Sequence, residues 1–171
     1  MTASGSPAAR WHPAYVALGS NLDDPATQVL RAFGALAGLP DTRVVLRSSL
    51  YRSAPLGPVA QPDFVNAVAG LLTSLEASAL LHELKALETR LGRDTPIVRW
   101  GPRRIDLDLL AHGATRIVSE SITVPHPGIA ERAFVLVPWA EIAPSLEVPG
   151  VGRVGALARR LGATGLQRIE A

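Results

Sequence analysis

Residues 104–111 (RIDLDLLA) alternate charged and aliphatic side chains, and this pattern constrains the fold more than any other feature of the chain. Asp106 and Asp108 are two positions apart, and the positions around them are aliphatic: Ile105, Leu107 and Leu109. Successive side chains of a β-strand point to opposite faces, so both carboxylates are expected on one face and the aliphatic side chains in the core. The two carboxylates then lie about 7 Å apart at Cα, close enough to share a hard cation or a metal pair.

Apolar patterning along the chain predicts the order of the other elements. In chain order they are a strand at 15–18, a helix that starts at Pro25 behind Asp23 or Asp24 as cap, strands at 43–52 and 64–72, a helix capped by Ser74, the strand at 104–111, a hairpin around Gly113, a helix at 133–142 and a short helix near 154–161. The order β-α-β-β-α-β indicates a single α+β domain of the split β-α-β type.

Composition is consistent with one folded domain. The chain has 171 residues, of which 47% are hydrophobic and 19% charged, and this excludes a disordered chain. Residues 1–12 are expected to be a flexible leader without the apolar centre of a signal peptide, and residues 13–171 to be the domain. No run is long and apolar enough to cross a bilayer. The absence of cysteine excludes disulfides, thiolate metal sites and cysteine nucleophiles, and we expect a cytoplasmic protein.

The basic residues are almost all arginine. Of the 17 lysines and arginines only Lys85 is a lysine, and the planar guanidinium fork suits phosphate oxygens. The net charge is only +2, which weighs against a nucleic-acid binder with a large basic field. No Gly-rich run ends in Lys-Ser or Lys-Thr, so a Walker-type phosphate loop is absent. A nucleotide would therefore have to be bound by a different kind of phosphate-binding site.

Four arginines lie close to the aspartate pair in the sequence: Arg93, Arg99, Arg103 and Arg104. Carboxylates for Mg²⁺ beside guanidiniums for phosphate form the combination that phosphoryl transfer needs. The strand alone fits an amphipathic edge strand with solvated acids and a basic loop equally well. Trp100 favours a site, because an indole beside Gly and Pro in a charged loop suits stacking on a flat ligand.

Two further segments carry weaker signals. Residues 54–62 form a loop stiffened by three prolines, and on the next strand Phe64 and Asn66 share one face, which together suit a flat pocket for a heterocycle. A structural turn with Asn66 bonded to backbone explains the same residues. His126 with Arg132 is consistent with a phosphate-binding loop, although a loop histidine alone proves nothing. The other histidines, His12, His82 and His112, have no partner at metal-ligand spacing and are expected to be structural or solvent-facing.

Four segments carry a resemblance to a known family: YVALGSNL, YRSAPLGPVAQPDFVNAV, RWGPRRIDLDLL and VPHPGIAERAF. On these segments, which cover about residues 14–145, the chain resembles the 6-hydroxymethyl-7,8-dihydropterin pyrophosphokinase family of folate biosynthesis. The resemblance implies a ferredoxin-like α+β fold with α/β/α layers and a mainly antiparallel sheet, and a monomer. It also implies magnesium-dependent transfer of the β,γ-diphosphoryl group of ATP to the pterin hydroxymethyl oxygen, which leaves AMP.

The resemblance assigns roles residue by residue. Asp106 and Asp108 match the ligands of two Mg²⁺ ions, and with Arg93 and Arg103 they form the expected catalytic set. The positions that match the pterin pocket are Ser53, Leu56, Gly57, Phe64, Asn66, Trp100 and Phe134. The positions that match the ATP side are Glu88, Arg93, Arg99, Arg103, Ile105, His126 and Arg132. No independent general base is evident, so our hypothesis is that metal coordination acidifies the pterin hydroxyl and that Asp106 accepts its proton.

Three positions depart from the family pattern. Thr95 stands where many members have a second arginine after Arg93, Phe64 stands where tyrosine is frequent, and Ala54 replaces a frequent proline. Residues 93–103 combine charge, Pro and Gly with few apolar anchors, and we expect them to form a mobile lid.

Two other functions compete with this interpretation. A non-catalytic nucleotide- or RNA-binding module needs exposed sheet aromatics and a basic stripe, whereas this chain is 5% aromatic and places acids on the relevant strand. A Mg²⁺-dependent phosphohydrolase would use the same aspartate pair but would not need the proline-stiffened loop or Trp100. The expected partners are therefore ATP and 6-hydroxymethyl-7,8-dihydropterin, with no nucleic acid and no membrane.

Overall fold

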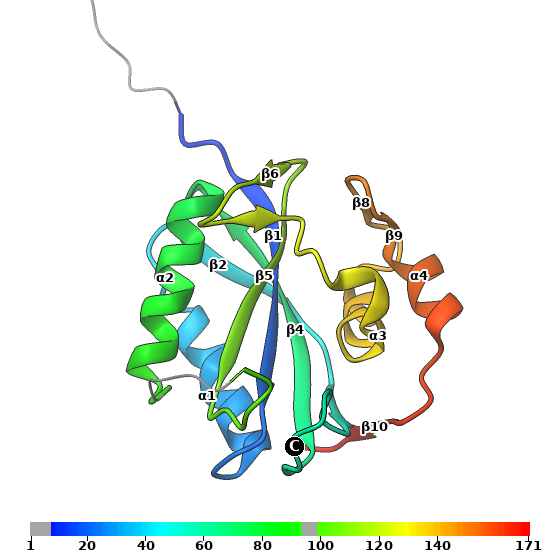
Figure 1. Ribbon diagram of the computed structural model, residues 1–171. Helices are drawn as coiled ribbons and strands as arrows, with labels where there is room; N and C mark the ends of the chain where they lie inside the picture. The colour runs from blue at the N-terminus through cyan, green and yellow to red at the C-terminus, as the bar shows by residue number, and fades with distance from the viewer. Residues whose placement is uncertain (1–7, 94–98) are drawn as a thin grey trace, which may run out of the picture.

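The computed structural model describes residues 8–93 and 99–171, in which a central sheet lies between two layers of helices (Figure 1). Helices α1 (Pro25–Leu36) and α2 (Ala77–Arg90) cover one face of the sheet. Helix α3 (Ala133–Ile142) covers the other face, and α4 (Val154–Leu161) packs against α3. The α/β/α layering and the α+β class predicted from the sequence are confirmed.

Within the described residues, the main sheet has six strands, all paired antiparallel. They are β1 (His12–Ser20), β2 (Thr42–Arg47), β3 (Leu50–Ser53), β4 (Phe64–Thr73), β5 (Asp106–His112) and β10 (Leu166–Ile169). Their order is β10-β3-β4-β1-β5, and β2 pairs with the distal part of β4. Without the added edge strand β10, this is the ferredoxin-like βαββαβ arrangement.

One expected strand, 43–52, is broken into β2 and β3. The break is at Ser48, whose hydroxyl accepts a hydrogen bond from the Val68 N–H (2.9 Å) and whose own N–H donates to the Val68 carbonyl (2.9 Å). Both halves still pair with β4, so the topology is unchanged. The start of β1 also differs from expectation, because it includes His12, which we assigned to the leader.

Other local expectations were partly wrong. The N-cap of α2 is Glu76 rather than Ser74, whereas Asp24 does cap α1: its Oδ1 accepts from the Thr27 N–H (3.5 Å), and its Oδ2 also accepts from the Thr27 hydroxyl (2.8 Å). The turn at Gly113 does not form the expected hairpin, because the Gly113 N–H donates to Pro13 of β1. The short strands that follow pair with each other instead: β6 (Ile117–Val118) with β7 (Thr123–Val124), and β8 (Glu147–Val148) with β9 (Gly152–Arg153). A short 3₁₀ turn, η1 (Ile129–Glu131), precedes α3.

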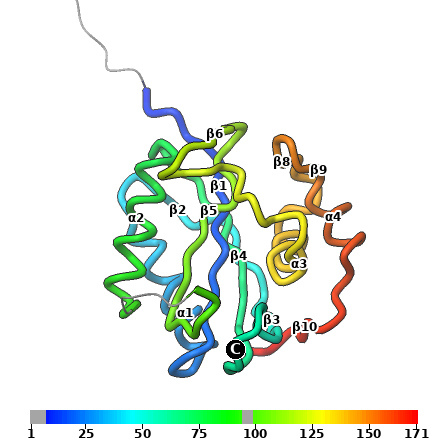
Figure 2. Tube along the Cα trace, in the orientation of Figure 1, coloured from blue at the N-terminus to red at the C-terminus, as the bar shows by residue number. Residues whose placement is uncertain are grey.

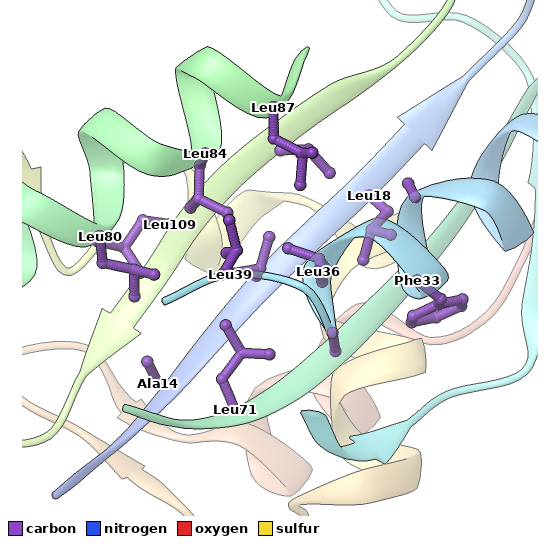
Figure 3. Packing of buried hydrophobic residues seen from close by; sticks show 14 of the residues in the cluster. Ala14, Leu18, Phe33, Leu36, Leu39, Leu71, Leu80, Leu84, Leu87 and Leu109 are labelled. Atoms are coloured by element: carbon purple, nitrogen blue, oxygen red, sulfur yellow. The ribbon is translucent and has the colours of Figure 1, made fainter. Parts of the chain in front are cut away.

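Hydrophobic burial on both faces of the sheet holds these layers together. Leu80, Leu84 and Leu87 lie on one side of α2 at helical spacing and point toward the sheet (Figure 3). On the opposite face, Leu136 and Trp139 of α3 are fully buried in a second cluster. Each such side chain contributes about 1.5–3 kcal/mol of transfer free energy. The two cores fix β1, β4 and β5 as a rigid platform.

The C-terminal segment closes the sheet on its outer edge. From α4 the chain returns along the outside of the molecule to β10, which pairs with β3 (Figure 2). No helix within residues 8–93 and 99–171 is both long and apolar enough to span a membrane.

Candidate active site

The antiparallel order brings the end of β1 and the starts of β4 and β5 to one end of the sheet. A cavity of about 280 Å³ opens there, bounded by these strands, by the loop after β3 and by the segment that precedes α3. Among its lining residues are Gly19, Ser53, Leu56, Gln61, Phe64, Asn66, Trp100, Arg103, Asp106, Asp108, His126, Arg132 and Phe134. Residues that are distant in the sequence and were assigned to a pterin side and an ATP side thus share one cavity.

Gly19 lies at the centre of the cavity floor. It pairs with Asn66 of β4 on one side and with Asp106 of β5 on the other. A Cβ atom on Gly19 would lie 3.2 Å from Asn66 Oδ1 and 4.0 Å from Phe64 Cδ1. The missing side chain therefore opens the space between an amide and a carboxylate, and sequence reasoning had assigned Gly19 only to a turn.

Asn66 is buried and oriented by its neighbour. Its Nδ2 donates to Ser53 Oγ on β3 (2.8 Å), and Phe64 precedes it on the same face of β4. Phe134, at the start of α3, also lines the cavity. Two aromatic rings and an oriented amide are the groups that a flat, hydrogen-bonding heterocycle requires.

The indole of Trp100 packs on the loop after β3. A Cβ atom on Gly57 would lie 3.3 Å from Trp100 Cγ, and Gly57 has a positive φ of 87°, so glycine suits this close approach. Gly57 does not itself line the cavity but supports the indole that does. Trp100 has a positive φ of 64° and is 40% exposed, and the Arg99 guanidinium lies 5.5 Å from its ring centroid. Arg99 was expected on the ATP side; the structure places it against the indole and outside the cavity lining.

Asn21 joins the three loops around the cavity, a role that sequence reasoning missed. Its Oδ1 accepts from the Arg103 N–H (2.8 Å), and its Nδ2 donates to Gln61 Oε1 and to the Pro62 carbonyl (both 3.0 Å). Gln61 in turn donates to the Trp100 carbonyl. Asn21 is only 2% exposed, so these bonds form away from solvent. The loop after β1, the loop after β3 and the loop before β5 are therefore held as one unit.

Asp106 is held by two arginines. Its Oδ1 accepts from Arg93 (2.8 Å) and its Oδ2 from Arg103 (2.7 Å). Burial raises the pKa of Asp106, but the two guanidiniums outweigh it and leave the pKa below the ordinary value. Both oxygens are engaged and the charged form is favoured, which disfavours our hypothesis that Asp106 accepts the substrate proton. In this geometry Asp106 anchors the arginines.

Asp108 differs from Asp106 although it shares the same face. Burial and the nearby charge of Asp106 raise its pKa, and within the described residues it accepts no hydrogen bond. Its nearest cation is Lys85, with Nζ 3.9 Å from Oδ1. The two aspartates therefore have unequal counter-charges.

Glu88 lies behind the cavity and is 3% exposed. Its Oε1 accepts from the Leu107 N–H of β5 (2.7 Å) and from Lys85 Nζ (3.0 Å), while Oε2 accepts from Arg93. Burial raises the pKa of Glu88. The resemblance placed Glu88 on the ATP side, but here it ties α2 to β5 and orients Arg93.

The segment before α3 contributes His126 and Arg132. The Gly128 N–H donates to His126 Nδ1 (3.1 Å), so the neutral ring carries its proton on Nε2. Burial lowers the pKa of His126, which favours this neutral form. Both side chains line the cavity beside Asp108.

Besides Gly57, Glu88 and Arg99, two further assigned residues do not line the cavity. The Ile105 side chain is fully buried in the core beneath the sheet, and Arg93 acts through Glu88 and Asp106 rather than as a lining residue. Thr95 and the central part of the expected lid lie outside the described residues.

The donor set around Asp106 and Asp108 fits Mg²⁺. Both are carboxylates on one face of β5, and both line the cavity. Within the described parts of the chain, no three His, Cys, Asp or Glu side chains converge into a metal-binding group. The protein thus supplies two carboxylates, and water and substrate oxygens would complete the shell, as is usual for Mg²⁺.

Comparison with known proteins identifies the family of the chain. A family model described as 7,8-dihydro-6-hydroxymethylpterin-pyrophosphokinase (HPPK) matches residues 15–144. A relative from Pseudomonas aeruginosa, named 2-amino-4-hydroxy-6-hydroxymethyldihydropteridine pyrophosphokinase, is 49% identical over 135 residues, which are 79% of this chain and 83% of the relative. A relative of the same name from Methylorubrum extorquens is 43% identical over 157 residues, which are 92% and 98% of the two chains.

A solved structure supports the fold. The crystal structure of Plasmodium falciparum HPPK-DHPS wild type with pteroate matches 97% of this chain with a TM-score of 0.75 and 13% sequence identity. This chain spans 47% of that longer protein. The family match covers most of the chain, and the resemblance inferred from the four motifs is confirmed: the chain belongs to the 7,8-dihydro-6-hydroxymethylpterin-pyrophosphokinase family.

Proposed function

We propose that this chain transfers the diphosphoryl group of ATP to 6-hydroxymethyl-7,8-dihydropterin in folate biosynthesis and releases AMP. One observation carries the assignment to residues: the aspartate pair of β5 and the amide–aromatic pocket of β4 line the same cavity of about 280 Å³. A hydroxymethyl group on a ring bound at Asn66 can thereby reach a phosphate bound near Asp106 and Asp108.

The pterin ring is proposed to bind between Phe64 and Phe134, with its amide-like edge on Asn66. The Ser53 hydroxyl accepts from Asn66 Nδ2 and so fixes the amide, with Oδ1 on the side of Gly19. Phe64 supplies a stacking face without the hydroxyl of a tyrosine. Leu56 and Trp100, with Gly57 behind the indole, form the apolar wall on the side of the loop after β3.

The triphosphate is proposed to bind along Arg103, His126 and Arg132, which line the cavity on the side of the aspartates. Arg93 reaches this region through its bond to Asp106. Asp106 and Asp108 are proposed to hold two Mg²⁺ ions, which supply charge neutralisation at the phosphate oxygens.

In the reaction, the bond between the β-phosphorus and the oxygen that bridges to the α-phosphorus breaks. The pterin hydroxymethyl oxygen forms the new bond to the β-phosphorus, AMP leaves with the bridging oxygen, and the hydroxyl proton is released. The protein contributes mainly orientation of the two substrates and cations at the transferred group.

We also propose that the enzyme acts in the cytoplasm as a monomer, since one chain provides every side chain named above. Residues 13–171 are the proposed catalytic domain, and residues 1–12, apart from the start of β1, are a proposed leader.

An AMP-release assay with ATP, Mg²⁺ and 6-hydroxymethyl-7,8-dihydropterin tests the proposal. We expect pterin-dependent AMP from the native chain and at least about a hundredfold loss in Asp106→Ala and Asp108→Ala. Glu147→Ala, an exposed carboxylate on β8, is the matched control and should retain activity. Orthophosphate instead of AMP would assign a phosphohydrolase, and pterin-independent ATP binding without product would assign a binding module.

A further inference from the structure

Lys85 projects from α2 toward β5 and has no part in the roles assigned above. Its ammonium donates to Glu88 Oε1 and to the Leu107 carbonyl oxygen, each at 3.0 Å, and lies 3.9 Å from Asp108 Oδ1. The Lys85 side chain is 46% exposed and that of Asp108 is 29% exposed. The ammonium therefore stands beside this carboxylate at the edge of the buried charge cluster.

The two aspartates are open to an incoming cation to different degrees. Asp106 has a guanidinium on each oxygen, at 2.8 and 2.7 Å. Asp108 has one cation within 4.0 Å among the residues the structure covers, and that cation is Lys85. A divalent ion that reaches the site before nucleotide would thus meet Lys85 as its direct competitor for Asp108.

We propose that Lys85 is a positioning residue that controls divalent-cation binding at Asp108. Without nucleotide, its ammonium offsets the carboxylate charge and weakens binding of a free divalent ion. With nucleotide, triphosphate oxygens accept hydrogen bonds from the Lys85 ammonium, and the divalent ion binds at Asp108 together with the nucleotide. The inference depends on the proposed role of Asp108 as a metal ligand. Lys85 is the chain's single lysine, and its charge is the feature on which the mechanism depends.

The size of the effect follows from Coulomb's law. At about 4 Å in a water-like dielectric, a unit charge and a divalent ion interact strongly enough to change an equilibrium constant by about tenfold or more. Partial solvent exposure keeps the effect near the lower end of this range, because salt and water screen exposed charges.

The experiment is a titration of the full chain with Mn²⁺ in the absence of nucleotide, followed by water-proton relaxation. Lys85→Met removes the charge and keeps the aliphatic stem, and it should bind Mn²⁺ about tenfold more tightly than the native chain. Lys85→Arg keeps the charge and should bind like the native chain. Arg90→Met changes the net charge equally at an exposed position of the same helix and should also bind like the native chain.

Equal or weaker Mn²⁺ binding by Lys85→Met would overturn the proposal, as would an equal gain in Arg90→Met. Repeating the titration with ATP should narrow the difference between Lys85→Met and the native chain, and an unchanged difference would refute coupled binding. Asp108→Asn tests the underlying site separately: if it binds Mn²⁺ like the native chain, Asp108 is not the ligand. Should Lys85→Met unfold at a lower temperature, Lys85→Gln, which retains a donor for the Leu107 carbonyl, replaces it in the comparison.

Discussion

Replacing Glu88 by alanine should destabilise the fold before it affects nucleotide binding directly. The carboxylate is buried and satisfies the Leu107 N–H of the edge strand β5, the Lys85 ammonium and the Arg93 guanidinium. In Glu88→Ala the Leu107 N–H loses its side-chain acceptor, which costs about 1–3 kcal/mol, and two cations lose a partner. Arg93 retains Asp106 and Lys85 is half-exposed, so the total loss should be about 3 kcal/mol.

Glu88→Gln separates hydrogen bonding from charge. The amide oxygen can still accept from the Leu107 N–H, while the negative charge is lost, so we expect a smaller loss of about 1–2 kcal/mol. Glu83→Ala on the same helix is the control, because Glu83 accepts no hydrogen bond within the described residues. Urea unfolding measures the stability of all three variants. A loss of about 3 kcal/mol shifts the unfolding midpoint by about 1.5 M urea, and the dependence of the unfolding free energy on urea concentration stays unchanged.

The refuting result is specific. If Glu88→Ala unfolds within about 0.5 kcal/mol of the native chain but binds ATP more than about tenfold more weakly, Glu88 contacts nucleotide and does not support β5. If both variants lose stability equally, charge rather than the hydrogen bond to Leu107 dominates.

Three further predictions follow from the same geometry. Gly19→Ala places a Cβ 3.2 Å from Asn66 Oδ1, so pterin affinity should fall about tenfold with ATP affinity unchanged in calorimetric titrations; equal losses for both ligands would contradict this. Asn21→Ala removes the bonds that join the three loops and should lower the free energy of unfolding by about 2 kcal/mol; a loss below about 0.5 kcal/mol would show that the loops hold without it. The pKa of Tyr51 is raised to about 12, mainly by burial and then by the hydrogen bond from its hydroxyl to Glu141 (2.7 Å). The contribution of this contact to the free energy of unfolding is therefore complete below pH 10.0 and is lost as the pH rises toward 12. Glu141→Gln should move the ultraviolet titration of Tyr51 toward 10.0, and an unchanged curve would exclude Glu141 as a cause.

The aspartate pair and the main elements were predictable because each depends on local pattern. The alternation around Asp106 and Asp108 has a period of two and could only place both carboxylates on one face of a strand. The predicted bounds of α3 and α4 agree with the structure. The break between β2 and β3 was not predictable, because it depends on Ser48 meeting Val68, which is distant in the sequence.

The supporting residues of the site were hidden for a related reason. Asn21 has the residue type and position of an ordinary turn asparagine, yet its side chain bonds to Pro62 and Arg103. Lys85 and Glu88 are three residues apart and look like an exposed ion pair on a helix, but Glu88 is buried against β5. Nothing in their local sequence distinguishes a solvated pair from one that faces a strand.

The charges of the cluster explain why substrate and metal must be considered together. Lys85, Arg93 and Arg103 contact the carboxylates of Glu88, Asp106 and Asp108, so the cluster is nearly neutral before any ligand binds. A fully ionised triphosphate with the two divalent ions proposed above is also nearly neutral. If the ligands bind as proposed, Asp106 and Asp108 would hold the ions and the phosphate oxygens would pair with Lys85 and the arginines, so every charge would keep a partner of opposite sign. A metal ion alone would leave cations unpaired in a partly buried site, which is costly. The arrangement therefore favours metal and nucleotide binding together over either one alone.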